Sequence, residues 1–269
     1  MKPESPTKTA AIIAGHGSIL SDAGGAMVRI AEQLREQAIV PIVEAGFLNY
    51  NRPTFADALT SALTQGATRI LVLPYFLIAG SYVCNDLQKM VENARISYPQ
   101  ISFTVTEVLG LHPLLVELAT QRLQTLLAED ISLASEQSNR RRALLFVAHG
   151  TSLEAANLPI VQVLRQVQSE LGYHDAALGF LDCNQPDIPS AFDQLVATGI
   201  AQIDVLPYFL HLGRHVRKDL PAHFAAARQR HDGIAIRIAR HLDDETLLAR
   251  ICSERISENC ELQTIDFGE

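Results

Sequence analysis

The segment "LPYFLHLGRHVRKD" occupies Leu206–Asp219, and a related segment, "LPYFLIAGSYVCND", occupies Leu73–Asp86. The two segments lie 133 positions apart and share the opening LPYFL, a Gly, a Val and the closing Asp. The later copy carries His211 and His215 where the earlier copy has Ile and Tyr. This similarity indicates two copies of one structural unit, of which only one carries the histidines.

The same offset relates two further pairs of segments. "AIIAGHGS" (Ala11–Ser18) aligns with "LLFVAHGT" (Leu144–Thr151), and "GFLNYNRP" (Gly46–Pro53) aligns with "GFLDCNQP" (Gly179–Pro186). No gap is needed between the aligned blocks. The sequence therefore predicts two repeats, which we expect to form domains at residues 1–133 and 134–269, with the boundary in the polar segment 129–142.

Within each repeat, short apolar runs alternate with longer amphipathic segments. In the first repeat we expect strands at residues 11–14, 43–48, 70–77 and 101–109, and helices at 24–37 and 54–65. The second repeat has its fourth apolar run at residues 234–240. Strand–helix–strand alternation predicts an α/β fold, namely two similar doubly wound domains with parallel sheets and the strand order 2-1-3.

Composition restricts the possible functions. The chain has 269 residues, of which 48% are hydrophobic, and this is enough apolar sequence for buried cores. No apolar run reaches the ~18 residues of a membrane span, so we expect a cytoplasmic protein that does not bind membranes. The net charge of −8 argues against nucleic-acid binding. Four cysteines without CxxC spacing are expected to be free thiols.

Three residues of the second repeat are good ligands for a transition metal. His149 and Asp182 follow the first and second predicted strands, and His215 follows the third. Ligands of open parallel sheets bind at the carboxyl ends of the strands, where these side chains can converge. Two imidazoles and one carboxylate would leave coordination positions open for chemistry. We therefore predict that His149, Asp182 and His215 are both metal ligands and catalytic residues.

The first repeat has His16, Asn49 and Tyr82 at the equivalent positions, and only His16 is a good metal ligand. The first repeat therefore resembles a degenerate copy of the predicted site. Another interpretation of each His-Gly pair is that the His simply hydrogen-bonds a tight turn. His211 could be a further ligand, a hydrogen-bonding neighbour of the site or a rim residue.

The motifs "GHGS", "AHGT", "GFLD" and "LPYFLHLGRHVRKDLP" resemble those of sirohydrochlorin chelatases of the CbiX/SirB type, which are class II chelatases. The resemblance covers nearly the whole chain, in the long two-domain form of the family. It implies a lyase that inserts Co²⁺ or Fe²⁺ into sirohydrochlorin without ATP, for cobalamin or siroheme synthesis. The tetrapyrrole would enter a cleft between the two domains. No organic cofactor is expected, and the divalent metal is a substrate.

Carried over position by position, the resemblance assigns the family's two active-site histidines to His149 and His215 and its acid, usually Glu, to Asp182. Sirohydrochlorin carries carboxylates, so cations or helix starts should line its pocket. The substrate-binding residues expected from the sequence are Arg214, Arg217, His211, Thr151, His16 and Ser18. Ser18 and Thr151 are also expected to cap the helices that follow them.

Other functions remain open at this point. The chain could be a non-catalytic tetrapyrrole- or metal-binding protein, or a chelatase for another ring or for nickel. A metal-dependent hydrolase could use the same three residues, although no nucleophile is evident. Nucleotide binding is disfavoured because "GHGSILSDAGG" lacks GxGxxG spacing and a following Lys. The sequence allows either a monomer or a homodimer.

Overall fold

The computed structural model describes residues 7–17, 24–128, 141–211, 213–243 and 245–261, and within these ranges the side chains of residues 214–216 and 261 are outside the description. Ser18, most of the predicted boundary segment 129–142, and the side chains of Arg214 and His215 thus lie outside it. None of the helices in the described ranges combines the length and apolar character that crossing a membrane requires.

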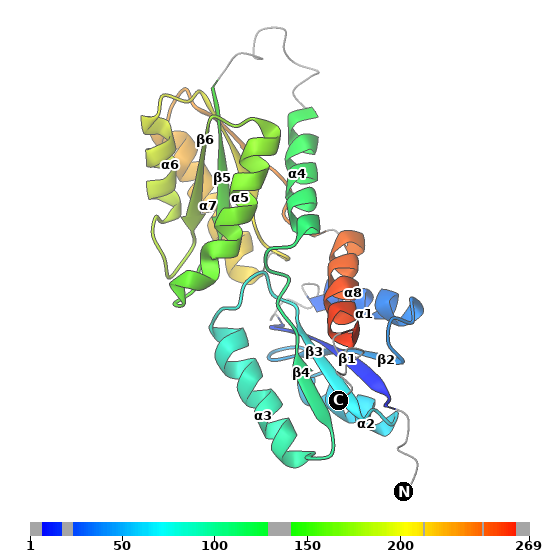
Figure 1. Cartoon of the computed structure of the whole chain (residues 1–269). Helices are drawn as coiled ribbons and strands as arrows, with labels where there is room; N and C mark the ends of the chain where they lie inside the picture. The colour runs from blue at the N-terminus through cyan, green and yellow to red at the C-terminus, as the bar shows by residue number, and fades with distance from the viewer. Residues whose placement is uncertain (1–6, 18–23, 129–140, 212, 244, 262–269) are drawn as a thin grey trace, which may run out of the picture. The chain divides into compact units, whose positions relative to one another are not determined.

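Each repeat forms a four-stranded sheet in which all strands are parallel (Figure 1). The first sheet has the order β2-β1-β3-β4 and the second has the order β6-β5-β7-β8. The strands are β1 Thr9–Gly15, β2 Ile42–Phe47, β3 Arg69–Pro74, β4 Ser102–Val105, β5 Arg142–Ala148, β6 Asp175–Phe180, β7 Gln202–Pro207 and β8 Ala235–Ile238. The predicted α/β class and the 2-1-3 order are confirmed, with the fourth strand outside the third.

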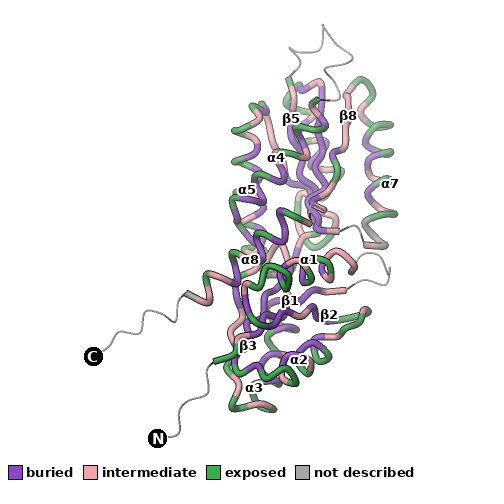
Figure 2. Tube along the Cα trace, turned by 90° about the vertical axis from the view of Figure 1, so that its right-hand side faces the viewer, coloured by how far each residue is buried: buried purple, intermediate pink, exposed green. Residues whose placement is uncertain are grey.

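The 133-residue offset holds in three dimensions. Ala10 pairs with Ile42 in the first sheet, and Ala143 pairs with Asp175 in the second. The two LPYFL segments begin at the last two residues of β3 and β7, which occupy the same position in their sheets. Every residue of these two strands is buried, as expected for a parallel sheet covered on both faces (Figure 2).

Helices and helical turns connect the strands. They are α1 Gly25–Glu36, α2 Phe55–Thr64, η2 Tyr82–Leu87, α3 Gln88–Ser97, α4 Pro113–Ala128, η4 Glu154–Asn157, α5 Leu158–Leu171, α6 Ile188–Ala197, α7 Arg214–Arg230 and α8 Glu245–Glu261. Local capping fixes two of the starts. Thr54 and Asp57 form a capping box at α2, and the carboxylate of Asp187 accepts from the Ser190 N–H (2.8 Å) at α6.

The compact units do not coincide with the two sequence repeats. One unit comprises Met1–Gly110 with Glu245–Glu269, and the other comprises Leu111–Asp244. Helix α4 therefore belongs to the first repeat but packs with α5 and β7, whereas α8 belongs to the second repeat and packs with α1 and β3. The last helix of each sequence repeat therefore packs in the compact unit formed mainly by the other repeat. In this sense the two repeats exchange α4 and α8.

Each exchanged helix is held by an arginine at the same repeat position. Arg122 of α4 donates from Nε to the carbonyl of His241 (3.0 Å), and Arg255 of α8 donates from Nε to the carbonyl of Val108 (3.1 Å). The two acceptors are also 133 positions apart. Hydrogen bonds from a charged donor contribute more than neutral ones, and Arg255 is only 8% exposed. The exchange is thus built into both repeats by the same contact.

The second unit contains a buried ion-pair network centred on Asp204. The carboxylate of Asp204 on β7 accepts from Arg237 (2.7 and 2.9 Å), from the Tyr173 hydroxyl (2.8 Å) and from Gln202 (3.1 Å). Burial, more than the neighbouring Asp204, raises the pKa of Tyr173 well above its ordinary value. In the first unit Leu71 stands at the position of Asp204, so the shared fold does not require the network.

We predict that the two repeats stay together when the chain is broken between α4 and β5. Residues 1–133 lack α8, whose buried side chains include Leu248, Ile251 and Ile256. Each fully buried aliphatic side chain contributes about 1.5–3 kcal/mol. Fragments 1–133 and 134–269 should therefore co-purify when co-expressed and melt as one cooperative unit in circular dichroism.

Fragment 1–133 expressed alone should aggregate, or form a homodimer in which α4 covers the sheet of a second copy. A stable monomer of this fragment, shown by light scattering and a cooperative melt, would contradict the exchange.

Candidate functional site

His149 and Asp182 are neighbours at the carboxyl edge of the second sheet. They directly follow the β5–β6 pair, and two backbone hydrogen bonds extend the ladder beyond the strands. The N–H of Leu181 donates to the carbonyl of Ala148 (2.9 Å), and the N–H of Asp182 donates to the carbonyl of His149 (2.9 Å). Both side chains are exposed, so each is available to a ligand.

Gly150 makes this close pairing possible. Its φ is +91°, in the left-handed region that favours glycine. A Cβ at this position would lie 2.1 Å from the carbonyl oxygen of Asp182 and 2.8 Å from Oδ1 of Asn184. Any side chain here would force the β5 and β6 ends apart, so the glycine of the "HG" motif is required by the turn.

Asn184 holds the loop between β5 and α5 through side-chain hydrogen bonds. It was not among the site residues predicted from the sequence. Its Oδ1 accepts from the N–H of Thr151 (2.7 Å) and from Nδ2 of Asn157 (3.1 Å). Asn51 stands at the same repeat position, and its Oδ1 lies against Gly17 in the same way. The Asn-x-Pro that both repeats share was the sequence signal for this role.

The Asp182 carboxylate lies at the rim of a small hollow of about 260 Å³. Its Oδ1 accepts from the N–H of Cys183 (2.7 Å), a residue with a left-handed φ of +65° and an exposed thiol. The hollow is formed by the β6–α6 loop from Phe180 to Asp187. Hydrogen bonds from Ser190 lower the pKa of Asp187 below its ordinary value, which favours the ionised carboxylate at the start of α6.

Thr151 does not cap the helix in the way we expected. Its hydroxyl accepts from the N–H of Leu153 (3.3 Å), whereas Asn157 occupies the N-cap position of α5. The turn η4 intervenes between Thr151 and the helix, so the predicted cap forms only a local turn. The corresponding cap at Ser18 lies outside the described residues.

The third predicted ligand, His215, lies in the first turn of α7, directly after β7. Because β7 is hydrogen-bonded to β5, this turn starts from the same sheet edge as His149. The side chains of His215 and Arg214 are outside the description. His211 is half-buried and Arg217 is exposed, with its N–H donating to the carbonyl of Gly213 (2.9 Å).

Among the side chains that the structure describes, no three His, Cys, Asp or Glu residues lie close enough together to hold a metal ion. The side chain of His215 is not among those described. The three-residue site of His149, Asp182 and His215 therefore stays a prediction, of which the structure describes the first two members and the backbone of the third.

The first unit has the same backbone but a different set of side chains. The N–H of Asn49 donates to the carbonyl of His16 (3.0 Å), as at the equivalent Asp182–His149 pair. The ring of His16 lies near two tyrosine rings, with its centroid 4.1 Å from that of Tyr82 and 5.8 Å from that of Tyr50. The predicted degenerate metal site is thus a cluster of aromatic rings.

The aromatic residues of the LPYFL motifs have a structural role. Tyr208 is buried and stacks on Phe146 with 5.2 Å between centroids, and Tyr75 is 6% exposed. Burial raises the pKa of both tyrosines well above the ordinary value. These rings are core residues of the two units.

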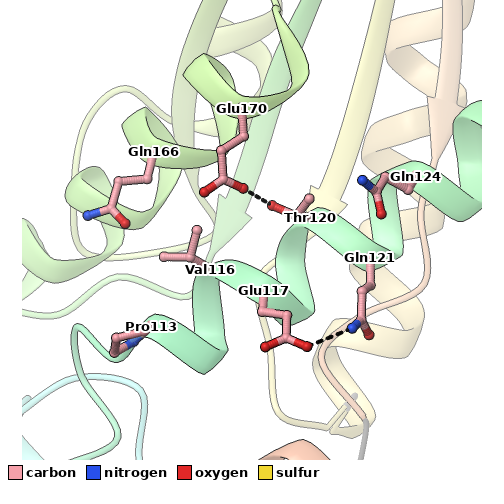
Figure 3. A pocket seen from close by; sticks show the side chains of 8 residues that line it. All are labelled: Pro113, Val116, Glu117, Thr120, Gln121, Gln124, Gln166 and Glu170. Atoms are coloured by element: carbon pink, nitrogen blue, oxygen red, sulfur yellow. Dashed lines mark hydrogen bonds between the residues drawn. The ribbon is translucent and has the colours of Figure 1, made fainter.

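A larger groove of about 460 Å³ lies between α4 and α5, away from the predicted site residues (Figure 3). Several of its polar side chains bond to each other. The hydroxyl of Thr120 donates to Glu170 (2.8 Å), and Nε2 of Gln121 donates to Glu117 (3.0 Å). It contains no His or Cys, so we assign the candidate site to the sheet edge rather than to this groove.

Comparison with known families agrees with this geometry. The family model CbiX matches the chain twice, at residues 10–126 and 143–259. The chain belongs to the CbiX family. The two matches correspond to the two repeats, and the predicted resemblance is confirmed.

Named relatives and solved structures of this family support the assignment. The chain is 24% identical over 231 residues to the sirohydrochlorin ferrochelatase of Priestia megaterium, covering 82% of this chain and 84% of the relative. It is 23% identical over 220 residues to the sirohydrochlorin cobaltochelatase of the same organism, covering 82% and 70%. The structure of SirB from Bacillus subtilis with Fe³⁺ superposes with a TM-score of 0.80 at 19% identity, covering 97% and 99%. The class II chelatase fold is confirmed.

We predict that Gly150→Ala lowers the free energy of unfolding more than Gly199→Ala, a replacement that strains the backbone but causes no clash. Gly199 has a φ of +74° and open space around it, so Gly199→Ala tests the strain alone, at about 1–2 kcal/mol. Gly150→Ala adds a clash with the Asp182 carbonyl and should lower the free energy of unfolding further. Urea unfolding of both variants measures the difference, and equal effects would contradict the close approach.

Proposed function

We propose that this chain is a chelatase of the lyase class that inserts a divalent metal ion into sirohydrochlorin without ATP. Its metal substrate is Co²⁺ or Fe²⁺, and its product serves cobalamin or siroheme synthesis. The observation that carries this proposal is the pairing of His149 with Asp182 at a sheet edge of the CbiX fold. The names of the Priestia megaterium relatives support the choice of substrate.

The reaction exchanges two protons for one metal ion. Two pyrrole N–H bonds of the macrocycle break, four nitrogens bind the cation, and no electron is gained or lost. Imidazole exchanges protons near neutral pH, so His149 suits the role of proton acceptor. The Asp182 carboxylate suits the attraction of a partly dehydrated cation and the removal of the released protons. His215, the second residue of α7, completes the proposed set of ligands.

Substrate binding is proposed for the remaining predicted residues. Arg214 and Arg217 begin α7 beside the site, and a helix start attracts anions. Together with His211, they would bind carboxylates of the macrocycle. Thr151 and His16 lie in the turns that follow β5 and β1, and Ser18, which is outside the described residues, stays a predicted substrate-binding residue from the sequence alone.

The first test is metal insertion itself. The wild-type protein should change the absorbance spectrum of sirohydrochlorin under anaerobic conditions with Co²⁺ or Fe²⁺, and Ni²⁺ tests the alternative metal. His149→Ala should lower turnover by about 100-fold or more, as expected for loss of a proton-transferring group. His16→Ala should lower turnover less, because the first unit has Asn49 and Tyr82 in place of the other two ligands.

Folding of both variants is checked by circular dichroism. A reversed order, with His16→Ala inactive and His149→Ala active, would move the catalytic site to the first unit. A wild-type protein that binds the macrocycle but never inserts a metal would favour a non-catalytic tetrapyrrole-binding protein.

A second test concerns the carboxylate. Asp182→Asn keeps the size, removes the charge and reproduces the residue of the first unit, so insertion should fall by about tenfold or more with folding intact. Asp182→Glu restores the acid usual in the family and should retain more activity than Asp182→Asn. Cobalt- and iron-insertion rates measure both variants. Wild-type rates for Asp182→Asn would show that the acid takes no part in the reaction.

A further inference from the structure

The first unit carries an exposed aromatic cluster formed by His16, Tyr50 and Tyr82. The three residues come from three connections at one sheet edge, namely those following β1, β2 and β3. Tyr50 is 69% exposed and Tyr82 is 43% exposed. Both His16–tyrosine ring pairs are tilted, at 38° and 41°. The arrangement offers ring faces and edges to solvent at the position that holds the predicted metal ligands in the other repeat.

The His16 ring is held by these aromatic contacts. Its Nδ1 is buried and has no hydrogen-bond partner among the atoms that the structure describes. A histidine that served as a metal ligand or proton carrier normally has its second nitrogen oriented by a hydrogen bond. The contacts that the structure shows for the His16 ring are instead with two tyrosine rings.

The backbone conformation of the turn does not explain why a tyrosine stands at position 50. Its φ is +63°, and the equivalent Cys183 has a φ of +65°, so the shared turn needs a left-handed residue here. Gly, Asn or Asp would adopt this conformation more easily than a bulky aromatic residue. Tyr50 thus presents a bulky aromatic side chain, 69% exposed, at a position where the turn itself gives no reason for one.

Two exposed apolar side chains of the second unit have a related position, whereas Leu111, which is also exposed, lies just before α4. Leu153 and Leu158 are 41% and 60% exposed, and both follow β5 on the side of His149. In each unit, considered separately, large apolar side chains are thus exposed beside the strand ends. Exposed apolar groups gathered at the functional edge of a sheet are typical of a ligand site.

We infer that His16, Tyr50 and Tyr82 form a stacking surface for the face of the tetrapyrrole macrocycle. This inference rests on the proposed function and assigns the first unit to substrate binding rather than metal capture. A conjugated ring system presents apolar faces to which aromatic side chains pack well, in offset or tilted geometry. The tyrosines therefore bind and orient the macrocycle without taking part in proton transfer.

The inference predicts a change in binding without a change in chemistry. Tyr50→Ala and Tyr82→Ala should each raise Kd for metal-free sirohydrochlorin, and KM, on the order of tenfold, with kcat within about twofold of wild type. Tyr50→Phe and Tyr82→Phe keep the ring and should restore most of the affinity. Ile96→Ala is the matched control, because Ile96 is 72% exposed near the end of α3, away from the cluster.

The chain contains no tryptophan, which permits a second readout. Tyr50→Trp introduces a single tryptophan whose emission should be quenched on anaerobic addition of metal-free sirohydrochlorin, more strongly than that of Ile96→Trp. This variant keeps an aromatic ring and does not depend on the folding of the alanine variants. Equal quenching at the two positions would count against the surface.

The outcomes separate this inference from the proposed function. If wild type inserts metal while both alanine variants bind the macrocycle with wild-type Kd, the stacking surface is refuted and the chelatase assignment stands. A fall in kcat with unchanged KM would also overturn it, because it would place the tyrosines in the chemical step. If wild type neither binds sirohydrochlorin nor inserts a metal, the proposed function fails and the inference fails with it.

Discussion

The close approach of Gly150 to the carbonyl of Asp182 is the constraint on which the rest of the site depends. The backbone of β5 and β6 continues to pair for two residues beyond the strands, and this is possible only where no Cβ separates them. The pairing fixes the backbone of His149 beside that of Asp182. Both side chains stay exposed, so the backbone provides the geometry while the imidazole and carboxylate remain available. Gly17 imposes the same geometry at His16, and the site architecture is therefore a property of the repeat rather than of one domain.

The exchange of α4 and α8 is the second constraint on this architecture. A parallel sheet needs helices on both faces, and here one face of each sheet is completed by a helix from the other repeat. Arg122 and Arg255 anchor the exchanged helices at equivalent carbonyls. Neither repeat contains all of the parts of one compact unit, which couples the folding of the two. A mutation that weakens α8 should therefore destabilise the first unit, although α8 belongs to the second repeat.

The sequence predicted the sheets because their signal is local and repeated. Buried strands such as β3 and β5 are continuous apolar runs in the sequence. The offset of 133 residues shows which strand of the first repeat corresponds to which strand of the second. The helix exchange was not predictable in this way, because the apolar face of an amphipathic helix does not specify which sheet it covers. Asn184 was missed since its role is to accept hydrogen bonds within a loop, and such contacts leave no periodic pattern. The pairing of His149 with Asp182 followed from the strand order, whereas the aromatic packing of His16 depended on side-chain contacts that spacing does not reveal.

The two repeats separate what the backbone provides from what the side chains add. The hydrogen bond from residue 49 to residue 16 measures 3.0 Å, and the equivalent bond from residue 182 to residue 149 measures 2.9 Å. On this common backbone one repeat carries Asp182, Cys183 and His215, and the other carries Asn49, Tyr50 and Tyr82. The first set consists of groups that bind cations and exchange protons, whereas the second has no carboxylate and two aromatic side chains. A reaction that brings a cation to a large planar ring needs both kinds of surface. One repeat has only three of these positions at its sheet edge. With two repeats, one set of positions can carry metal-binding groups and the other set can carry aromatic groups.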